Sequence, residues 1–211
     1  MANTAAINRI NGLRDIRRSP ASHLAAALAA GSIQGTVVLK EGPFQTMAGV
    51  RVDPRSEEGA RVAAVAGSLP ARYGDVGGTD RVIILWLGPS EFLVVAPEEA
   101  HDSLGGDLIG SLVAALGDAP GQVVDLSANR TTFELSGPRA RATLEKGCAL
   151  DLHPRSFTVG TALSTEIGNI PVVLQKTGEE SFRLLPRASF ADFLGRWLLD
   201  AMREFASPEV P

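Results

Sequence analysis

The chain has 211 residues, of which 45% are hydrophobic, so it can bury a substantial core as one domain or as two small lobes. Its 20 Lys and Arg are scattered among 24 Asp and Glu, and the net charge of −4 excludes the strongly basic surface that binds nucleic acid. A single cysteine, Cys148, rules out an intrachain disulfide, and no apolar run approaches the roughly 18 residues of a membrane helix. We therefore expect a cytoplasmic globular protein that binds neither nucleic acid nor a membrane.

Residues 1–20 are expected to form an N-terminal arm. Arg17 and Arg18 precede an alanine-rich stretch, an order that a twin-arginine export signal also has. The stretch is only mildly apolar and contains His23, and its composition equally suits a short helix capped near Ser22. We favour the helix.

Two strands and a helix are predicted next. Apolar runs at 36–40 and 46–52 predict strands joined by a turn, because a Gly-Pro pair lies between them. The stretch 56–70 opens with Ser56, which suits a helix N-cap, and continues with two acids and then with apolar residues at helical spacing. It therefore predicts a helix.

The most apolar part of the chain follows. Two continuous apolar runs within 81–97, separated by Gly-Pro-Ser, predict a hairpin at the centre of a sheet, covered on both faces. A leucine at every fourth position then predicts a helix over 103–117. Gly105, Gly106 and Gly110 each weaken that helix by about 1 kcal/mol relative to alanine.

The segment DLSANRTTFELSGPRA, residues 125–140, places many polar side chains between two strand-like pieces. Apolar and polar residues alternate in 122–127 and again in 131–137, which predicts a half-buried hairpin. In that hairpin Thr132 and Glu134 face outward. A catalytic centre, a binding edge and an ordinary polar turn are all compatible with such a run.

A short helix and three strands are expected after this segment. Pro138 suits the first turn of the helix and Gly147 its end. The three strands lie within 163–185, where Pro171 restricts its strand to a sheet edge or to a strand start.

The final helix is the clearest predicted element. Ser189 is expected to cap it, with Asp192 three residues further on. A broad apolar stripe follows, formed by Phe190, Phe193, Leu194, Trp197, Leu198, Ala201 and Phe205. We expect this stripe to belong to the core. The alternative is a partner-binding face, since Trp and Arg anchor interfaces and arginines lie nearby at Arg183, Arg187 and Arg196.

Strand groups and helices alternate without a steady βαβ rhythm. The order predicts an α+β protein of two small lobes, with mixed or antiparallel sheets and covering helices. We expect a single domain over 21–206, with lobes of about 21–120 and 121–206, and a C-terminal tail at 207–211.

Two groups of residues are candidates for nucleophilic catalysis. His101, Asp102 and Ser103 are adjacent, but consecutive side chains diverge whereas a catalytic triad converges, so we expect a surface loop and a helix cap. Cys148 and His153 form a second candidate pair. Without a group that orients the histidine, we favour a buried cysteine and a loop histidine.

Metal and nucleotide sites find no support in the sequence. The three histidines and the single cysteine match no zinc-ligand spacing, and no glycine-rich phosphate-binding motif follows a strand. Asp125, Glu134 and Glu145 are acidic residues near one another, and we expect them on solvated faces. We therefore assign no catalytic, cofactor-binding or metal-binding residue to this chain.

Three segments carry a family resemblance: WLGPSEFLVVAP, VVDLSANRTTFELSGPRARATLEKGCALDLHPRSF and FRLLPRASFADFLGRWLLDAMREF. They resemble the gamma subunit of heterotetrameric sarcosine oxidase from about residue 81 to 206, and SPASHL near the start is similar to that subunit's opening. The resemblance implies the aminomethyltransferase-like fold, which the glycine-cleavage T protein shares. The domain over 21–206 would then be gamma-like.

The resemblance also implies a function. The chain would be a non-catalytic structural gamma subunit of an oxidoreductase complex that oxidatively demethylates sarcosine to glycine. That complex produces hydrogen peroxide and either formaldehyde or 5,10-methylenetetrahydrofolate. The resemblance places FAD, FMN, NAD, zinc and tetrahydrofolate on the partner alpha, beta and delta subunits, with no cofactor on this chain.

Folate-binding relatives carry an acidic segment beside the folate. The closest segment here is YGDVGGTDR, residues 73–81, in which the acids are arranged differently. We expect Asp75 and Asp80 to be turn residues, and we carry no folate site over to this chain.

DLSANR resembles a family signature at a hairpin bend. There we expect Asp125 or Ser127 to bond the backbone and Arg130 to suit a bidentate contact across a subunit interface. Two alternatives to the gamma-subunit hypothesis remain: a free-standing, folate-dependent aminomethyltransferase-like protein, and a folate-free maturation factor that acts on other proteins.

Overall fold

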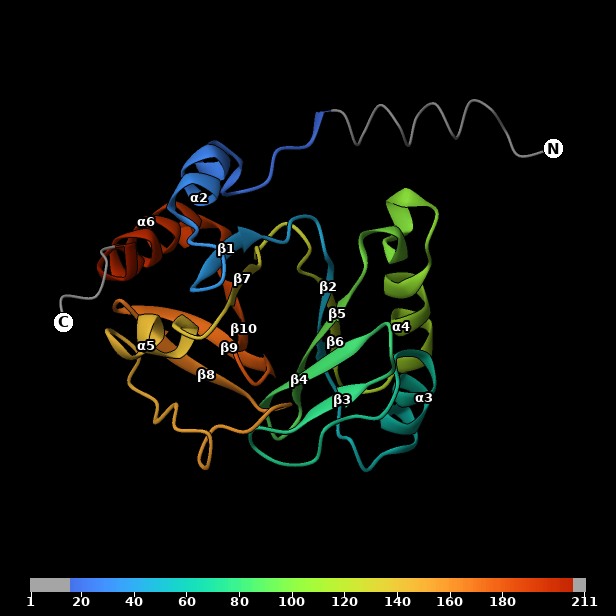
Figure 1. Cartoon of the computed structure of the whole chain (residues 1–211). Helices are drawn as coiled ribbons and strands as arrows, with labels where there is room; N and C mark the ends of the chain where they lie inside the picture. Colours follow the sequence, from blue (N-terminus) through green and yellow to red (C-terminus); the bar gives the residue numbers. More distant parts are fainter. Residues whose placement is uncertain (1–15, 207–211) are drawn as a thin grey trace.

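The computed structural model describes residues 16–206, and within them the chain forms four layers (Figure 1). Two five-stranded antiparallel sheets face each other, and helices cover the outer face of each sheet. The expected α+β class with two lobes is confirmed. The expected arm at 1–20 lies mostly outside the described residues, and the tail at 207–211 lies wholly outside them.

The first lobe contains a sheet of order β1-β7-β10-β9-β8. Its strands are β1 (Val38–Glu41), β7 (Phe133–Ser136), β8 (Ala162–Ile167), β9 (Ile170–Gly178) and β10 (Ser181–Pro186). Its helices are α2 (Ala25–Gly31), α5 (Ala140–Glu145) and α6 (Ala191–Met202), with the 3₁₀ turns η1 (Ser22–Leu24), η4 (Ala188–Phe190) and η5 (Arg203–Ala206). Helices and sheet enclose one apolar core between them.

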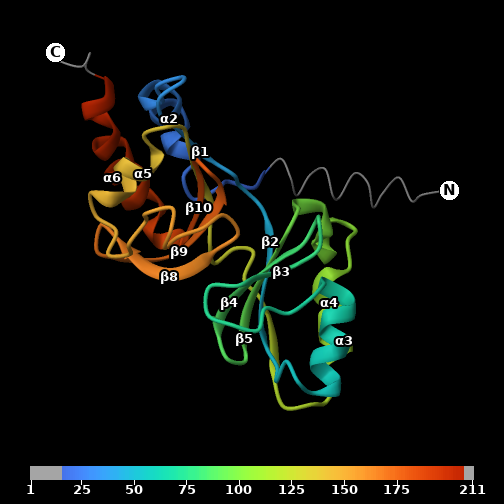
Figure 2. The ribbon, with the colours of Figure 1, turned by 60° about the horizontal axis from the view of Figure 1, so that its bottom comes forward.

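The second lobe contains a sheet of order β3-β4-β5-β2-β6. Its strands are β2 (Thr46–Arg51), β3 (Val76–Gly78), β4 (Ile83–Gly88), β5 (Glu91–Ala96) and β6 (Gln122–Asp125). Its helices are α3 (Glu57–Ala66) and α4 (Leu108–Leu116), and two 3₁₀ turns, η2 (Glu98–Ala100) and η3 (Asp102–Leu104), precede α4. Figure 2 shows the two lobes side by side, with α3 and α4 on the far side of the second.

Strand β5 shows why the apolar runs of the sequence are continuous. Phe92 and Val94 point toward α3 and α4, whereas Leu93 and Val95 point toward the first lobe. All four side chains are almost fully buried, and burying each contributes about 1.5–3 kcal/mol. The expected central hairpin with two covered faces is thus confirmed in β4 and β5, and β5 is the middle strand of its sheet.

The lobes interleave in sequence. Strand β1 pairs with β7 in the first lobe, and β6 pairs with β2 in the second, so the second lobe is inserted between two parts of the first. The expected division near residue 120 therefore separates the two sheets only in part. The chain crosses between the lobes twice, at 42–45 and at 126–132.

Two expected strand connections are wrong in the structure. The strands predicted at 36–40 and 46–52 exist as β1 and β2, but they belong to different sheets, and so do β6 and β7. Alternation of apolar residues shows which face of a strand is buried and does not show which strand lies beside it. The polar run at 125–132 is therefore a crossing between lobes and does not form a hairpin bend.

Helix starts also differ from expectation. Helix α4 begins at Leu108, because Gly105 adopts φ 91° and the Gly106 backbone packs against that of Ala100, where a Cβ would lie 2.3 Å away. The predicted cap at Ser56 is confirmed, since its side chain accepts from the Gly59 amide.

The caps expected at Ser22 and Ser189 are wrong, because neither helix start carries a side-chain cap bond. In α6 the buried face includes Leu194 and Leu198, whereas Phe193 is 49% exposed, so the apolar stripe is only partly core. Pro171 is the second residue of β9, which agrees with a strand start, and β9 is not an edge strand.

Candidate functional site

The inter-lobe segment 125–132 is fixed to the second lobe at its start. The Ser127 amide donates to Oδ1 of Asp125 (2.9 Å), which closes a turn directly after β6. The Ser127 hydroxyl accepts from the Met47 amide (3.0 Å), and the Leu126 amide donates to the Met47 carbonyl (2.8 Å). The expectation that Asp125 or Ser127 bonds backbone in a turn is confirmed for both residues.

The end of the same segment is fixed to the first lobe. Nη1 of Arg130 donates to the Leu185 carbonyl (2.7 Å), and the Thr131 hydroxyl donates to Oε1 of Glu41 (2.6 Å). Thr132, which was expected to face outward, is completely buried, because it lies where the segment enters the first lobe, with its hydroxyl 3.4 Å from Oε1 of Gln45. The polar residues of the segment therefore hold the two lobes together.

His101 connects this segment to the turn before α4. Its Nε2 lies 2.9 Å from Oδ2 of Asp125, and its Nδ1 accepts from the amide (3.1 Å) of Ser103, whose hydroxyl lies 2.8 Å away. Because Nδ1 accepts a hydrogen bond from the Ser103 amide, the proton of the neutral ring lies on Nε2, and Nε2 donates it in a hydrogen bond to Asp125. The structure thus places a serine, a histidine and an aspartate in one hydrogen-bonded chain.

The expected loop with a helix cap is confirmed, but the expected divergence of the three consecutive side chains holds only for Asp102. Asp102 diverges as expected and caps α4, since its two carboxylate oxygens accept from the Ile109 and Gly110 amides (2.9 and 2.8 Å). His101 and Ser103 converge because a tight 3₁₀ turn folds Ser103 back onto the ring. Asp125 was missed as their partner, and no spacing in the sequence indicates it.

The pKa of Asp125 is lowered from its ordinary value. Partial burial raises it, but the hydrogen bonds from Ser127 and His101 together outweigh burial. Asp125 is therefore ionised at neutral pH. The arrangement caps η3 and fixes the end of β6, and its histidine is held by both ring nitrogens.

A cavity of about 400 Å³ lies at this junction. Its walls come from the stretch before η1, from the two crossings between the lobes and from the second lobe, and they include Arg17, Arg18, Phe44, His101, Asp125 and Arg130. Arg17 stacks over the Phe44 ring at 4.2 Å and pairs with Glu98 at 2.6 Å. The cavity is therefore bordered by charged side chains, of which Arg17, Asp125 and Arg130 are held by contacts within the chain.

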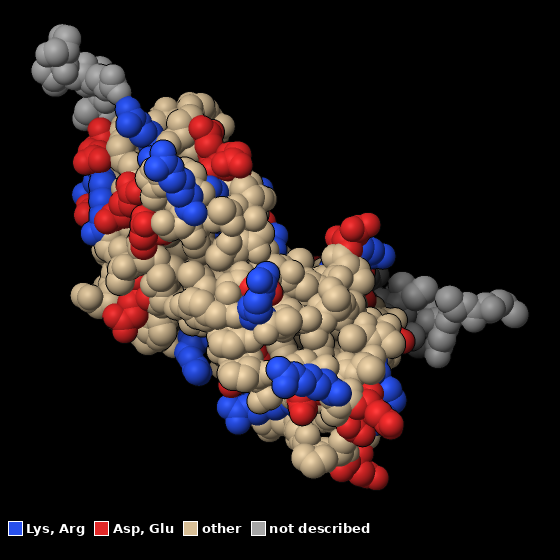
Figure 3. Space-filling model, turned by 90° about the horizontal axis from the view of Figure 1, so that it is seen from below, with Lys and Arg blue, Asp and Glu red and all other residues tan. Residues whose placement is uncertain are grey.

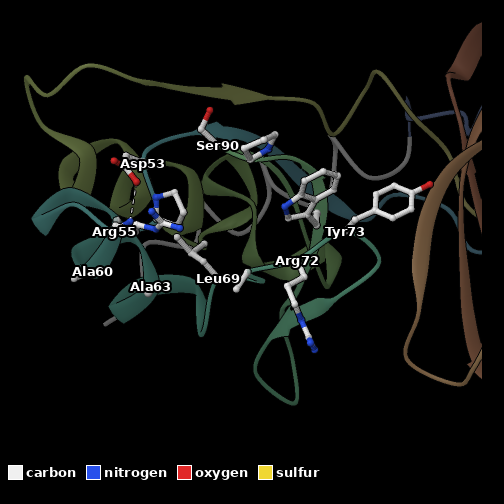
Figure 4. A pocket seen from close by; sticks show the side chains of 13 residues that line it. Asp53, Arg55, Ala60, Ala63, Leu69, Arg72, Tyr73 and Ser90 are labelled. Carbon is white, nitrogen blue, oxygen red and sulfur yellow. Dashed lines mark hydrogen bonds between the residues drawn. The ribbon is translucent and has the colours of Figure 1, made fainter.

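A larger open groove of about 750 Å³ lies on the second lobe (Figure 4). Asp53 and Arg55 lie at one end and Tyr73 at the other, where the Tyr73 and Trp86 rings meet edge to face with centroids 5.5 Å apart. The groove exposes aromatic surface without a convergent set of polar groups, so it suits contact with another molecule better than chemistry.

The acids that were compared with a folate segment lie in turns. The Asp75 amide donates to the Arg72 carbonyl, and its carboxylate lies 3.2 Å from the Arg72 guanidinium. Asp80 lies in the loop between β3 and β4. Both acids are thus turn residues, as expected. That this chain has no folate site stays a prediction.

The other candidate residues lie apart. Sγ of Cys148, which is half-buried, lies 3.9 Å from the Thr165 hydroxyl, whereas the exposed His153 accepts from the Arg155 amide through Nδ1 (3.2 Å). The Cys148–His153 pair therefore does not form.

The three carboxylates have separate partners. Glu134 pairs with Lys40 at 3.0 Å, Glu145 lies 3.6 Å from Arg141, and Asp125 bonds His101. Within residues 16–206, no cluster of three His, Cys, Asp or Glu side chains is arranged to hold a metal ion. Over the same range, no helix has the length and hydrophobicity needed to cross a membrane.

The two facing sheets with outer helices define the class of fold. The glycine cleavage aminomethyltransferase T of Bartonella henselae has a similar fold, with a TM-score of 0.59 and 16% identity over 83% of this chain and 48% of that one. The fold is therefore aminomethyltransferase-like. Residues 53–204 match the family model described as sarcosine oxidase, gamma subunit family.

Individual relatives agree with the family model. Sarcosine oxidase subunit gamma from Arthrobacter sp. and that from Corynebacterium sp. (strain P-1) are each 53% identical over 197 residues, or 92% of this chain and 94% of theirs. A chain of the heterotetrameric sarcosine oxidase from Corynebacterium sp. U-96, solved with pyrrole 2-carboxylate, has a TM-score of 0.87 and 48% identity, covering 93% of this chain and all of that one. This chain belongs to the sarcosine oxidase gamma subunit family, which confirms the resemblance found in the sequence.

Proposed function

We propose that this chain is the structural gamma subunit of a heterotetrameric sarcosine oxidase. The complex would be an oxidoreductase that converts sarcosine to glycine, reduces oxygen to hydrogen peroxide, and releases the one-carbon unit as formaldehyde or, with tetrahydrofolate, as 5,10-methylenetetrahydrofolate. The observation that carries the proposal is the 53% identity to curated gamma subunits, because it extends over 94% of their length.

The hydrogen bonds of the polar residues at the junction between the lobes agree with a structural role. Asp125, Ser127 and Thr131 are bonded to other parts of the same chain, so they contribute to the joint between lobes. Nδ1 of His101 accepts from the Ser103 backbone amide, and Nε2 faces Asp125, so the ring serves as the cap of η3 and as a link to the end of β6. We therefore assign no catalytic, cofactor-binding or metal-binding residue to this chain.

Partners and cofactors complete the proposal. The chain would bind alpha, beta and delta subunits in the cytoplasm, and those subunits would carry FAD, FMN, NAD, zinc and tetrahydrofolate. Support comes from the sequence, which has no glycine-rich phosphate-binding motif. Residues 21–206 would form the gamma-like domain, with 1–20 as an arm and 207–211 as a tail.

The surface suits a permanent partner. Figure 3 shows a face on which acidic and basic side chains are interspersed around broad uncharged areas. Exposed apolar side chains include Tyr73 (63%) and Phe193, which lie on different lobes. Interfaces of permanent complexes are typically apolar and above roughly 2,000 Å², so a partner that covers both lobes would bury such side chains.

Two activity measurements on the purified chain test the structural role. Without its partners, the chain should release no hydrogen peroxide when sarcosine is added, and sarcosine-dependent peroxide would overturn the non-catalytic assignment. Calorimetry with millimolar tetrahydrofolate should give no heat of binding. Heat of binding would instead support a free-standing aminomethyltransferase, and a monomer with only transient partners in the cell would support a maturation factor; the family match favours neither.

A further inference from the structure

Arg130 lines the cavity between the lobes, and within residues 16–206 it forms no ion pair with an acidic side chain. Nη1 of Arg130 donates to the Leu185 carbonyl, and this neutral group does not balance the positive charge. Nε of Arg130 is buried and has no hydrogen-bond partner among the residues that the structure describes. Burial, together with the nearby Arg187 guanidinium, lowers the pKa of Arg130, as expected for a cation that is poorly solvated and uncompensated.

A second guanidinium at the same cavity is also unpaired. Arg18 lines the cavity and is exposed, and within residues 16–206 it forms no ion pair. Its neighbour Arg17 differs, because Glu98 neutralises it at 2.6 Å. Two unpaired arginines from distant parts of the sequence therefore border one space.

Asp125 is the acidic group in the wall of this cavity, and it is already engaged. One of its oxygens accepts from the Ser127 amide and the other lies 2.9 Å from Nε2 of His101. Within residues 16–206 it forms no ion pair with Arg130 or Arg18, and its single negative charge balances at most one of the two arginines. The cavity keeps an excess of positive charge next to the apolar ring of Phe44.

We propose that this cavity binds a carboxylate between Arg18 and Arg130, with the carbon chain of the ligand against Phe44. A guanidinium presents two parallel N–H groups that match the two oxygens of a carboxylate, and pairing is strongest where the cation is partly desolvated. A cavity of about 400 Å³ holds a short carboxylic acid or one acidic side chain.

Two sources can supply that carboxylate. One is a free small carboxylic acid. The other is a Glu or Asp side chain of a neighbouring subunit, and this source rests on the proposed function. The chemistry is the same in both cases, so binding to the isolated chain and assembly with partners distinguish them.

The first experiment titrates the purified full-length chain with sodium succinate and sodium acetate, and with sodium phosphate for comparison. Calorimetry measures binding, and a shift of the ¹⁵N–¹H signal of the Arg130 Nε group shows that the ligand binds beside Arg130. A free-acid source predicts succinate binding that shifts this signal, is at least about tenfold weaker in Arg18→Gln, and is unchanged in Arg72→Gln. Arg72 is a matched control, because it is 84% exposed and lies outside this cavity. Phosphate that binds more tightly than succinate would overturn the carboxylate assignment.

The second experiment co-expresses the chain with its partner subunits and measures the stability of the complex at low and high salt. An acidic side chain as the source predicts no succinate binding by the isolated chain. It also predicts that Arg18→Gln weakens assembly at least about tenfold at low salt and much less at high salt. Arg155→Gln is the control here, because Arg155 is exposed and lines neither this cavity nor the groove on the second lobe. If the complex forms and neither succinate binding nor assembly responds to Arg18→Gln, the proposal is wrong while the proposed function stands; if no complex forms with the unmodified chain, the proposed function fails.

Discussion

Nε2 of His101 lies 2.9 Å from Oδ2 of Asp125, and this contact ties the turn before α4 to the end of β6. The two residues are 24 positions apart, and the contact lies where the chain leaves the second lobe for the first. Ser127, two residues further on, bonds both Asp125 and the backbone of Met47. The junction between lobes is therefore a hydrogen-bonded unit, and its stability depends on an ionised aspartate.

The lowered pKa of Asp125 predicts a loss of stability in acid. Its contribution is fully present above the ordinary pKa of 3.8 and is lost as the pH falls from there through the lower folded value. We expect the free energy of unfolding in urea to fall less steeply between about pH 5 and pH 3 for Asp125→Asn than for the unmodified chain. Asp118→Asn is the control, because Asp118 is exposed and forms no ion pair within residues 16–206. Equal slopes for Asp125→Asn and Asp118→Asn would contradict this prediction.

Two serines distinguish a real helix cap from an apparent one. Ser56 accepts from the Gly59 amide (3.0 Å), so Ser56→Ala should lower the free energy of unfolding by about 1 kcal/mol. Ser189→Ala should change it by less than about 0.5 kcal/mol, since no side-chain cap bond forms at the start of α6. Urea unfolding of both variants measures the difference. A larger loss of unfolding free energy in Ser189→Ala than in Ser56→Ala would contradict the structure, in which Ser56 is the capping residue.

Neighbouring positions on α4 test the outer core of the second lobe. Leu112 is fully buried, and Leu112→Ala should cost about 2–5 kcal/mol of stability by leaving a cavity. Val113 is 50% exposed, so Val113→Ala should cost less than about 0.5 kcal/mol. Thermal unfolding would show a much lower midpoint for the first variant. Similar midpoints for both would contradict the orientation of α4.

Gly147 allows the close approach of α6 to the loop after α5. A Cβ at this position would lie 2.5 Å from the ring of Trp197, so Gly147→Ala should destabilise the first lobe by about 1–3 kcal/mol. In a Trp86→Phe background, where Trp197 is the remaining tryptophan, its fluorescence should shift. Gly88→Ala is the control, because the nearest atom to its new Cβ would be 3.6 Å away. An unchanged Trp197 spectrum in Gly147→Ala would argue against this packing.

The sequence predicted where strands and helices lie better than it predicted which strands pair with each other. The runs at β4 and β5 were recognisable as buried strands because apolar residues fill both faces, and Ser56 was recognisable as a cap from the acids that follow it. The pairing of β1 with β7 was not predictable, because it joins residues about 95 positions apart and local alternation carries no information about distant partners.

At the junction, too, the sequence predicted local contacts but not contacts between distant residues. Asp125 and Ser127 were expected to bond the backbone, which follows from the local turn chemistry of Asp and Ser. The contact of His101 with Asp125 was missed, since it depends on how η3 is placed beside β6. The cavity that Arg18 and Arg130 share likewise exists only once the two lobes have packed together.

The most direct test of the gamma-subunit assignment is purification of this chain from its native cell under mild conditions. The mass and the flavin absorbance of whatever is purified with it are then measured. We predict a stable complex that contains larger, flavin-bearing subunits together with this chain. Recovery of the lone 22.1 kDa chain, with no flavin absorbance, would contradict it.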